Sequence, residues 1–425
     1  LSAGCLGTAV DPAATLPPPT LVDAVAALEA GEPAANVHLL GEWRERNGAE
    51  ADAWGDLLFV MSGSEVVVLN VSDPANLREE ARVASPVRVL DVKVSDDGAF
   101  LFVGNDAYLS GAPKGGKGVF TGGLYAFDIR DLSAPKLVAY QPVGERRGPH
   151  MVFYHRMPDG RELVFGANAD VSIHEFDREA GTFTELSRYQ ADLVTAFNRD
   201  PEVVDVLYQG WAHDMFVQQE PDGATLMYVA NWDAGLRIVD VTDPARPREL
   251  GGWNDFPKGH EGNLHTVAAD WVDGRRLVVG STEVGFAVVG GLHYAMGTDR
   301  SIAYVWDATD PAKPTLLGYW ENPLGLPAGR DQDVFGEEIT STHNLQLEGG
   351  RVYLAHYGLG VFVLDVSTPD QQAQPATLAY YQEDDLNVWD VVLSHGVVYA
   401  SGTGGIRALH YAPDVLGHDG LFSRA

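Results

Sequence analysis

Four histidines stand at the starts of four consecutive apolar segments that have the composition of buried strands. They are His150 in GPHMVF, His213 in WAHDMFV, His265 in NLHTVA and His343 in STHNLQL. Neutral imidazole is the commonest protein ligand for zinc, copper and iron, and three or four imidazoles leave room at a metal for water or a substrate. If the fold brings these side chains together, the sequence predicts a transition-metal site for copper, iron or zinc.

Two other interpretations of the four histidines stay open. They could form a ring of hydrogen-bonded structural side chains, or serve acid-base chemistry or anion binding. One histidine at a strand end is usually structural, but 13 histidines scattered over 425 residues would rarely place four at one equivalent position. Asp214, Thr266 and Asn344 follow three of them and are candidate hydrogen-bond partners, although strand alternation points neighbouring residues to opposite sides unless the strand bends.

Three glutamates are candidates for orienting ligands or moving protons beside such a site. Glu283 ends an apolar segment, and Glu337 and Glu338 lie in the long insertion 321–342. Together with the insertions 105–123, 190–210 and 284–301, this segment is expected to emerge where the histidine-bearing strands begin, and long loops on one face often cover a functional pocket. Further polar residues are expected near this rim, each of which could be another ligand, a proton shuttle or solvated surface: Asn231, His260, Glu261, His293 and His356.

The elements that must position these residues come from an internal repeat. Its copies are VVVLNVSDPANL (66–77), LYAFDIRDLSAPKL (124–137), LRIVDVTDPARPREL (236–250), IAYVWDATDPAKPTLL (302–317) and VFVLDVSTPDQQAQP (361–375). Each is an apolar strand that ends in an Asp, Ser or Thr turn with proline, and each is preceded by a strand pair joined by a DDG, PDG, VDG or EGG turn. Four short antiparallel strands per unit predict an all-β fold, a β-propeller.

Counting hairpins gives seven blades, near 48–83, 89–143, 149–190, 212–253, 264–320, 342–381 and 388–411, with six or eight as alternatives. The last has only three strands, and NVHLLGEW at 37–44 is expected to supply its outer strand and close the ring. Aligning the first residue of each inner strand puts Gly48, Leu90 and Trp389 in the column of the four histidines. Inner strands surround the axis of a propeller, so the histidines should converge.

Two resemblances follow from these segments. VDVTDPARP and WDATDPAKP resemble the LVIVD repeat of bacterial and archaeal surface propellers, and the similarity extends over most of residues 37–412. The segments from His213 to Leu250 and THNLQLEGG are also similar to inner blades of the selenium-binding protein and methanethiol oxidase family, whose enzymes use copper. That second resemblance implies metal-binding roles for His213 and His343. Because Cys5 is the only cysteine, cysteine-based selenium or thiol chemistry is excluded and the family's substrate does not carry over.

Composition limits the partners and the location. Asp and Glu number 60 against 29 Lys and Arg, and a net charge of -31 makes nucleic acid an unexpected partner. LSAGC resembles the end of a lipoprotein signal, so Cys5 could carry lipid, the alternative being a cysteine without a role. This predicts an extracytoplasmic protein, on the cell surface or in the periplasm, whose only membrane contact is that anchor.

The predicted organisation is a lipoprotein-like and Ala/Pro-rich tether (1–36), a propeller (37–412) and a C-terminal tail (413–425). Two functions fit it. One is a metal-dependent oxidoreductase in which the four histidines bind the metal and a small molecule is the substrate. The other is a surface module that binds a ligand through its loops without catalysis.

Overall fold

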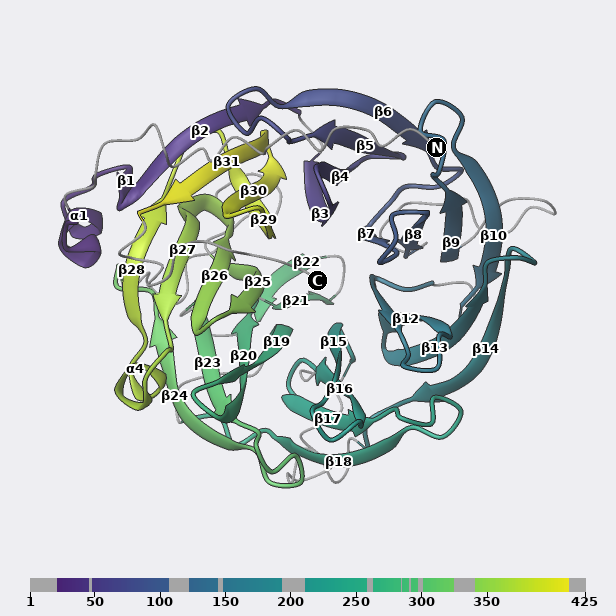
Figure 1. Ribbon diagram of the computed structural model, residues 1–425. Helices are drawn as coiled ribbons and strands as arrows, with labels where there is room; N and C mark the ends of the chain where they lie inside the picture. The colour runs from purple at the N-terminus through teal and green to yellow at the C-terminus, as the bar shows by residue number, and fades with distance from the viewer. Residues whose placement is uncertain are drawn as a thin grey trace.

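The computed structural model describes residues 21–45, 48–106, 122–143, 148–192, 211–257, 263–283, 285–289, 292–296, 301–324 and 341–412. Within these residues, seven antiparallel sheets stand in a ring around a central axis (Figure 1). The prediction of a seven-bladed β-propeller is confirmed. We number the blades one to seven from the sheet that begins at Gly48, and each has its first strand at the axis.

In the described residues, each of the first four blades consists of four strands that are consecutive along the chain. Their strands are β3 (Gly48–Trp54), β4 (Leu57–Ser62), β5 (Glu65–Asn70) and β6 (Arg78–Ala84); β7 (Asp91–Val94), β8 (Phe100–Asn105), β9 (Gly123–Asp128) and β10 (Lys136–Pro142); β11 (Met151–Arg156), β12 (Glu162–Asn168), β13 (Asp170–Asp177) and β14 (Thr182–Tyr189); and β15 (Asp214–Gln219), β16 (Thr225–Ala230), β17 (Leu236–Asp240) and β18 (Arg248–Trp253).

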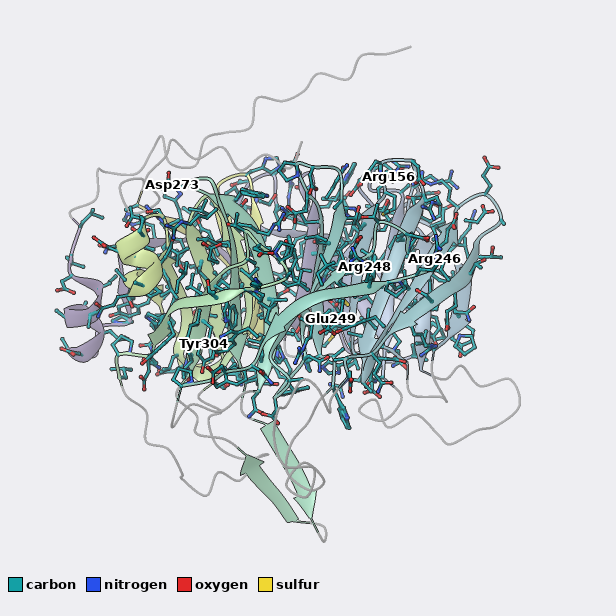
Figure 2. The ribbon with its side chains drawn as sticks, turned by 90° about the horizontal axis from the view of Figure 1, so that it is seen from below. Arg156, Arg246, Arg248, Glu249, Asp273 and Tyr304 are labelled. Atoms are coloured by element: carbon teal, nitrogen blue, oxygen red, sulfur yellow. The ribbon has the colours of Figure 1, made fainter. Side chains whose placement is uncertain are left out.

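Blades five to seven carry the departures from this pattern. Their strands are β19 (Leu264–Val272), β20 (Arg275–Thr282), β23 (Ile302–Asp307) and β24 (Thr315–Glu321); β25 (Thr342–Glu348), β26 (Arg351–His356), β27 (Gly360–Asp365) and β28 (Ala376–Tyr381); and β29 (Asn387–Ser394), β30 (Val397–Thr403) and β31 (Gly405–Tyr411). Between β20 and β23 a separate hairpin, β21 (Gly285–Val289) with β22 (Leu292–Met296), projects from the propeller body (Figure 2). A short 3₁₀ turn, η2 (Tyr357–Leu359), and a short helix, α4 (Pro369–Ala373), complete blade six.

The ring closes as predicted, through a strand from the start of the propeller. β2 (Val37–Trp43) pairs with β31 as the outer strand of blade seven. Gly41 in β2 lies so close to blade one that a Cβ added there would be 2.4 Å from the Pro74 carbonyl oxygen. Only a residue without a side chain fits this junction.

Side-chain hydrogen bonds in the turns explain why aspartate recurs at the end of each repeat. In blade four, Asp240 ends β17 and its carboxylate accepts the Thr242 backbone N–H at 3.0 Å, and three residues later Asp243 accepts the Ala245 N–H at 3.2 Å. Short side chains that bond their own backbone two residues on favour turns over strands. The same pair of turns recurs in blade five at Asp307 and Asp310, at 2.9 and 3.0 Å.

The core lies between the blades. Seven clusters of buried apolar side chains fill the seven interfaces between neighbouring blades, within the part of the chain that the structure describes. The cluster that joins blades seven and one includes Leu58, Val60 and Tyr399, which are at most 1% exposed. The blades are therefore held in the ring by side-chain packing.

Residues 21–36 lie against the propeller. Helix α1 (Ala24–Glu29) is capped by Asp23, whose carboxylate accepts the N–H groups of Val25 and Ala26 at 3.0 and 3.1 Å. Strand β1 (Ala34–Ala35) adds a fifth strand to blade six by pairing with β28. The tether predicted for 1–36 thus contacts the propeller in its described portion, and residues 1–20 lie outside the described residues. Among those described, no helix has the length and apolarity required to cross a membrane.

Candidate metal centre

The four predicted histidines converge at the channel. Neighbouring imidazole rings contact one another in blade order, with ring centroids 4.7 Å apart for His150 and His213, 4.0 Å for His213 and His265, and 4.1 Å for His265 and His343. His213, His265 and His343 are 8%, 1% and 4% exposed, and His150 is half-buried. The column predicted from the repeat is therefore a continuous row of imidazoles.

Strand register places each histidine just before the regular pairing of its inner strand, which begins at Met151, Asp214, Thr266 and Leu345. The backbone N–H groups of His150 and His213 still donate to the second strands, to the Ala167 and Ala230 carbonyls at 2.8 Å. At His265 and His343 the register shifts, between Leu264 and Thr266 and between Thr342 and Leu345. Such irregularities re-aim side chains at the ends of strands.

The same register corrects one member of the predicted column. Blade one shifts between Gly48 and Ala51, as blade six shifts between Thr342 and Leu345, so the residue equivalent to His343 is Ala49 and not Gly48. Gly48 is one residue too early, because it aligns with Thr342 of blade six and not with His343. The remaining members, Leu90 and Trp389, directly precede Asp91 and Asp390 in their inner strands.

One acidic candidate reaches the histidines. The Glu283 carboxylate lies 3.4 Å from His265 Nε2 and 3.8 Å from His343 Nε2, and it accepts a hydrogen bond from the Tyr357 hydroxyl. The ligand atoms of His213, His265 and Glu283 all lie within 4.8 Å of one another. Glu337 and Glu338 are outside the described residues, as are His260 and Glu261, and the side chain of His293 is not described.

Backbone carbonyls orient two of the imidazoles. His213 Nδ1 lies 3.1 Å from the His265 carbonyl oxygen, and His343 Nδ1 lies 2.6 Å from the Trp389 carbonyl oxygen. A carbonyl accepts only from a protonated nitrogen, so in the neutral ring Nε2 is the nitrogen with a free lone pair. His265 Nδ1 is buried and has no hydrogen-bond partner.

The environment keeps these imidazoles neutral. Burial, reinforced by the neighbouring histidines, lowers the pKa of His213 and of His265 well below 6.5. Burial also lowers the pKa of His343 to about 3, against the opposing effect of the Trp389 carbonyl. Neutral imidazole is the form that binds a metal.

The residues that follow the histidines do not bond to them. Thr266 donates its hydroxyl to the Asp214 carboxylate at 2.5 Å, and Asn344 donates its amide to Glu50 at 2.5 Å. They bond side chains of other blades. His356 is also apart from the row, with its Nε2 3.0 Å from the Ser301 hydroxyl and 3.3 Å from the Asn322 amide.

Comparison with known protein families finds a match. Residues 226–255 match the LVIVD repeat family, and this span holds most of β16 and all of β17 and β18, the outer three strands of blade four. The chain is a seven-bladed β-propeller that carries an LVIVD repeat in blade four. Its motif is LRIVD at 236–240, whose final Asp240 starts the turn described above.

The LVIVD propeller is also similar in structure to the C-terminal WD40 domain of Sif2, with a TM-score of 0.50 and 12% identity over 88% of this chain and 97% of that chain. At this identity the likeness shows the fold alone. No curated protein matches the chain. The resemblance to the selenium-binding protein family stays a prediction.

Sequence reasoning missed several side chains that surround the histidines of the LVIVD propeller. Trp232 packs on His213 with ring centroids 5.0 Å apart, and Tyr357 and Trp389 pack on His343 at 4.8 and 5.3 Å. Burial beside Glu283 raises the pKa of Tyr357 well above its usual value. The only sequence signal was Trp389, which shares the histidine column.

Proposed function

We propose that the LVIVD propeller is a metal-dependent oxidoreductase whose metal is held by His213, His265 and Glu283, with His150 and His343 on either side. The observation that carries this proposal is that the ligand atoms of two neutral imidazoles and one carboxylate gather within 4.8 Å at the channel. Three or four nitrogens and one carboxylate oxygen suit iron, copper or zinc.

The donor set passes a test of fit. Metal–nitrogen bonds of about 2.0–2.1 Å hold neighbouring ligand atoms about 3–3.5 Å apart, so the atoms within 4.8 Å need only small side-chain rotations. The unpaired, buried His265 Nδ1 is the kind of polar atom that otherwise costs free energy. Because the backbone carbonyls fix Nδ1 of His213 and His343 as donors, Nε2 is the metal-facing nitrogen of both rings.

A bound copper or iron would supply one-electron chemistry, and zinc would instead act as a Lewis acid. The chain's own residues would hold and transfer protons beside the metal. Tyr357 holds its hydroxyl proton against the Glu283 carboxylate, so Glu283 has a proton donor on the side away from His265. Trp232, Tyr357 and Trp389 surround the imidazoles with apolar rings that limit access of water.

We propose that the site takes a small-molecule substrate from the face on which the histidines lie. Figure 2 shows Arg156 and Asp273, which lie at the far ends of inner strands, on one face, and the β21–β22 hairpin projecting from the other. The histidines begin their inner strands, so they lie toward the face of the hairpin. We also propose an extracytoplasmic location, which is supported by the LSAGC segment, the acidic composition and the LVIVD repeat.

The proposal is tested by metal content. Elemental analysis of protein purified without an affinity tag or chelator should find about one copper, iron or zinc per chain. The double variant His213→Ala, His343→Ala should lose the metal. His174→Leu is the matched control. His174 lies in β13, away from the inner strands, is fully buried, and has no hydrogen-bond partner at either ring nitrogen. Oxidation of small reduced substrates would then be measured with the metal-loaded protein.

The second candidate function is a binding module that presents the projecting β21–β22 hairpin to a surface ligand. It predicts no stoichiometric metal in the wild type, even after reconstitution with each of the three metals, and an unchanged ligand affinity in the double histidine variant. That result would overturn the oxidoreductase proposal.

A further inference from the structure

A second layer of polar side chains lies one residue further along the inner strands. Each blade contributes the residue after its member of the histidine column, and in five of the seven blades that residue has a side-chain oxygen acceptor in a carboxylate or amide. The layer consists of Glu50, Asp91, Met151, Asp214, Thr266, Asn344 and Asp390.

Negative charge in this layer is buried and exceeds the available positive charge. Glu50, Asp91, Asp214 and Asp390 are 4%, 0%, 9% and 7% exposed. The one ammonium group among them, Lys93, is committed to Asp91, with Nζ 2.8 Å from its carboxylate and 3.0 Å from the Val92 carbonyl. Buried carboxylates without a counter-charge must bind a proton or a cation.

In two of these carboxylates, both oxygen atoms accept hydrogen bonds from backbone N–H groups. Asp91 accepts the backbone N–H of Val92 and, from blade three, of Val152, both at 2.7 Å. Asp390 accepts the N–H of Val391 at 2.8 Å and, from blade one, of Ala51 at 3.1 Å. These bonds link inner strands of neighbouring blades, and each oxygen keeps a further lone pair.

Glu50 and Asn344 have no such task. The Glu50 carboxylate crosses from blade one toward blade six, where it accepts the Asn344 amide at 2.5 Å. Asn344 is only 7% exposed, and its side-chain carbonyl oxygen is buried without a hydrogen-bond partner. Reversing the amide would place this oxygen against the Glu50 carboxylate, so the unpaired atom is an oxygen that needs a cation or donor.

We propose that a hard divalent cation of the calcium class binds in the channel between Glu50, Asn344 and Asp390, in the layer next to the histidine row, where the Glu50 carboxylate lies 3.9 Å from His343 Nδ1. The three residues occupy equivalent positions of blades one, six and seven, which are consecutive around the closed ring. They offer only oxygen atoms, which calcium and magnesium prefer, whereas the histidine row offers nitrogen.

The electrostatics support this assignment. Burial raises the pKa of Asp390 to about 6, against the opposing effect of Lys93. This shift indicates a carboxylate that is costly to ionise without a counter-ion, and a divalent cation supplies one.

The test is calorimetric titration of Ca²⁺ into chelator-washed protein in potassium chloride. Because the acidic surface also binds Ca²⁺ weakly, the quantity of interest is the difference between wild type and Glu50→Gln. We expect one Ca²⁺ per chain in the wild type, bound at least tenfold more weakly by Glu50→Gln. The melting temperature of the wild type should rise with Ca²⁺, and that of Glu50→Gln should not. Asp370→Asn, on the exposed surface of α4, should behave as wild type.

Asn344→Leu removes the orphan oxygen without changing charge and should also weaken binding, which keeps the test informative if Glu50→Gln folds poorly. The single variant His213→Ala should lose the proposed histidine-bound metal and keep the Ca²⁺ site, so this inference and the oxidoreductase proposal can fail separately. His343 is left unchanged in this control because its Nδ1 lies 3.9 Å from the Glu50 carboxylate. Superimposable titrations of wild type, Glu50→Gln and Asn344→Leu would overturn the inference and mean that protons neutralise the layer.

Discussion

Acid should destabilise the metal-free protein through His343, and the effect can be isolated by replacing that one side chain. The pKa of His343 is about 3 in the folded chain, against 6.5 for an unperturbed imidazole. A folded pKa below the unfolded one means that the unfolded chain binds the proton first. The free energy of unfolding therefore falls as the pH drops below 6.5, and this loss is complete only below about pH 3.

The magnitude follows from the two pKa values. Between about pH 7.5 and pH 5.0 the unfolded imidazole becomes almost fully protonated while the folded one stays neutral. Integrating the difference in bound protons gives a loss of about 2 kcal/mol for this residue alone. His343→Asn keeps a donor that can reach the Trp389 carbonyl and removes the titration, so it should lack this loss.

Urea unfolding, followed by tryptophan fluorescence with a chelator present, measures both proteins at the two pH values. All other titrating groups are common to both proteins. Their contributions cancel in the difference except for those of His213 and His265, whose pKa values His343 also lowers. From about pH 7.5 to 8.5, where neither imidazole titrates, the two proteins should keep a constant difference. If wild type and His343→Asn lose the same free energy of unfolding on acidification, the assignment of a neutral, desolvated imidazole at this position is wrong.

Two further predictions concern the layer and the blade contacts. Burial raises the pKa of Asp214 to about 7, so the contribution of this side chain to stability is lost as the pH rises through 7. Between about pH 6 and 8, the free energy of unfolding of the wild type should fall by about 1.4 kcal/mol more than that of Asp214→Asn, as measured by urea unfolding. Gly318→Val should lower the free energy of unfolding by about 3 kcal/mol or more, because a Cβ there would meet the Ala373 carbonyl oxygen at 2.0 Å. Tyr319→Val, at the adjacent exposed position, should lower it less. Equal urea midpoints for the two variants would contradict this prediction.

The sequence was sufficient for the fold and for the histidine row because both depend on repetition. Each blade repeats the same strands and turns, so aligning the repeats places His150, His213, His265 and His343 at one height without any knowledge of side-chain positions. Closure by β2 was predictable for the same reason, since blade seven lacked a strand and the first segment supplied one.

The rest of the site depends on departures from the repeat, which a sequence does not mark. Glu50 enters the layer only because the register of blade one shifts after Gly48, and it bonds to a residue 294 positions away. Trp232 reaches His213 from a backbone with a φ of 42°, a conformation that its residue type does not signal. Irregular backbone and contacts across the axis cannot be read from residue spacing.

The two channel layers oppose each other in their response to pH. The histidines favour the folded state above pH 6.5 and lose that contribution on acidification, whereas Asp390 and Asp214, with pKa values of about 6 and 7, lose theirs as the pH rises. Without cations, the folded channel is therefore penalised on both sides of neutral pH. A metal on the nitrogens would oppose protonation of the histidines, and a cation on the oxygens would favour ionised carboxylates. The two proposed sites, on adjacent residues of the same inner strands, would thus have opposite ligand preferences, and occupying both would widen the pH range over which the ring stays folded.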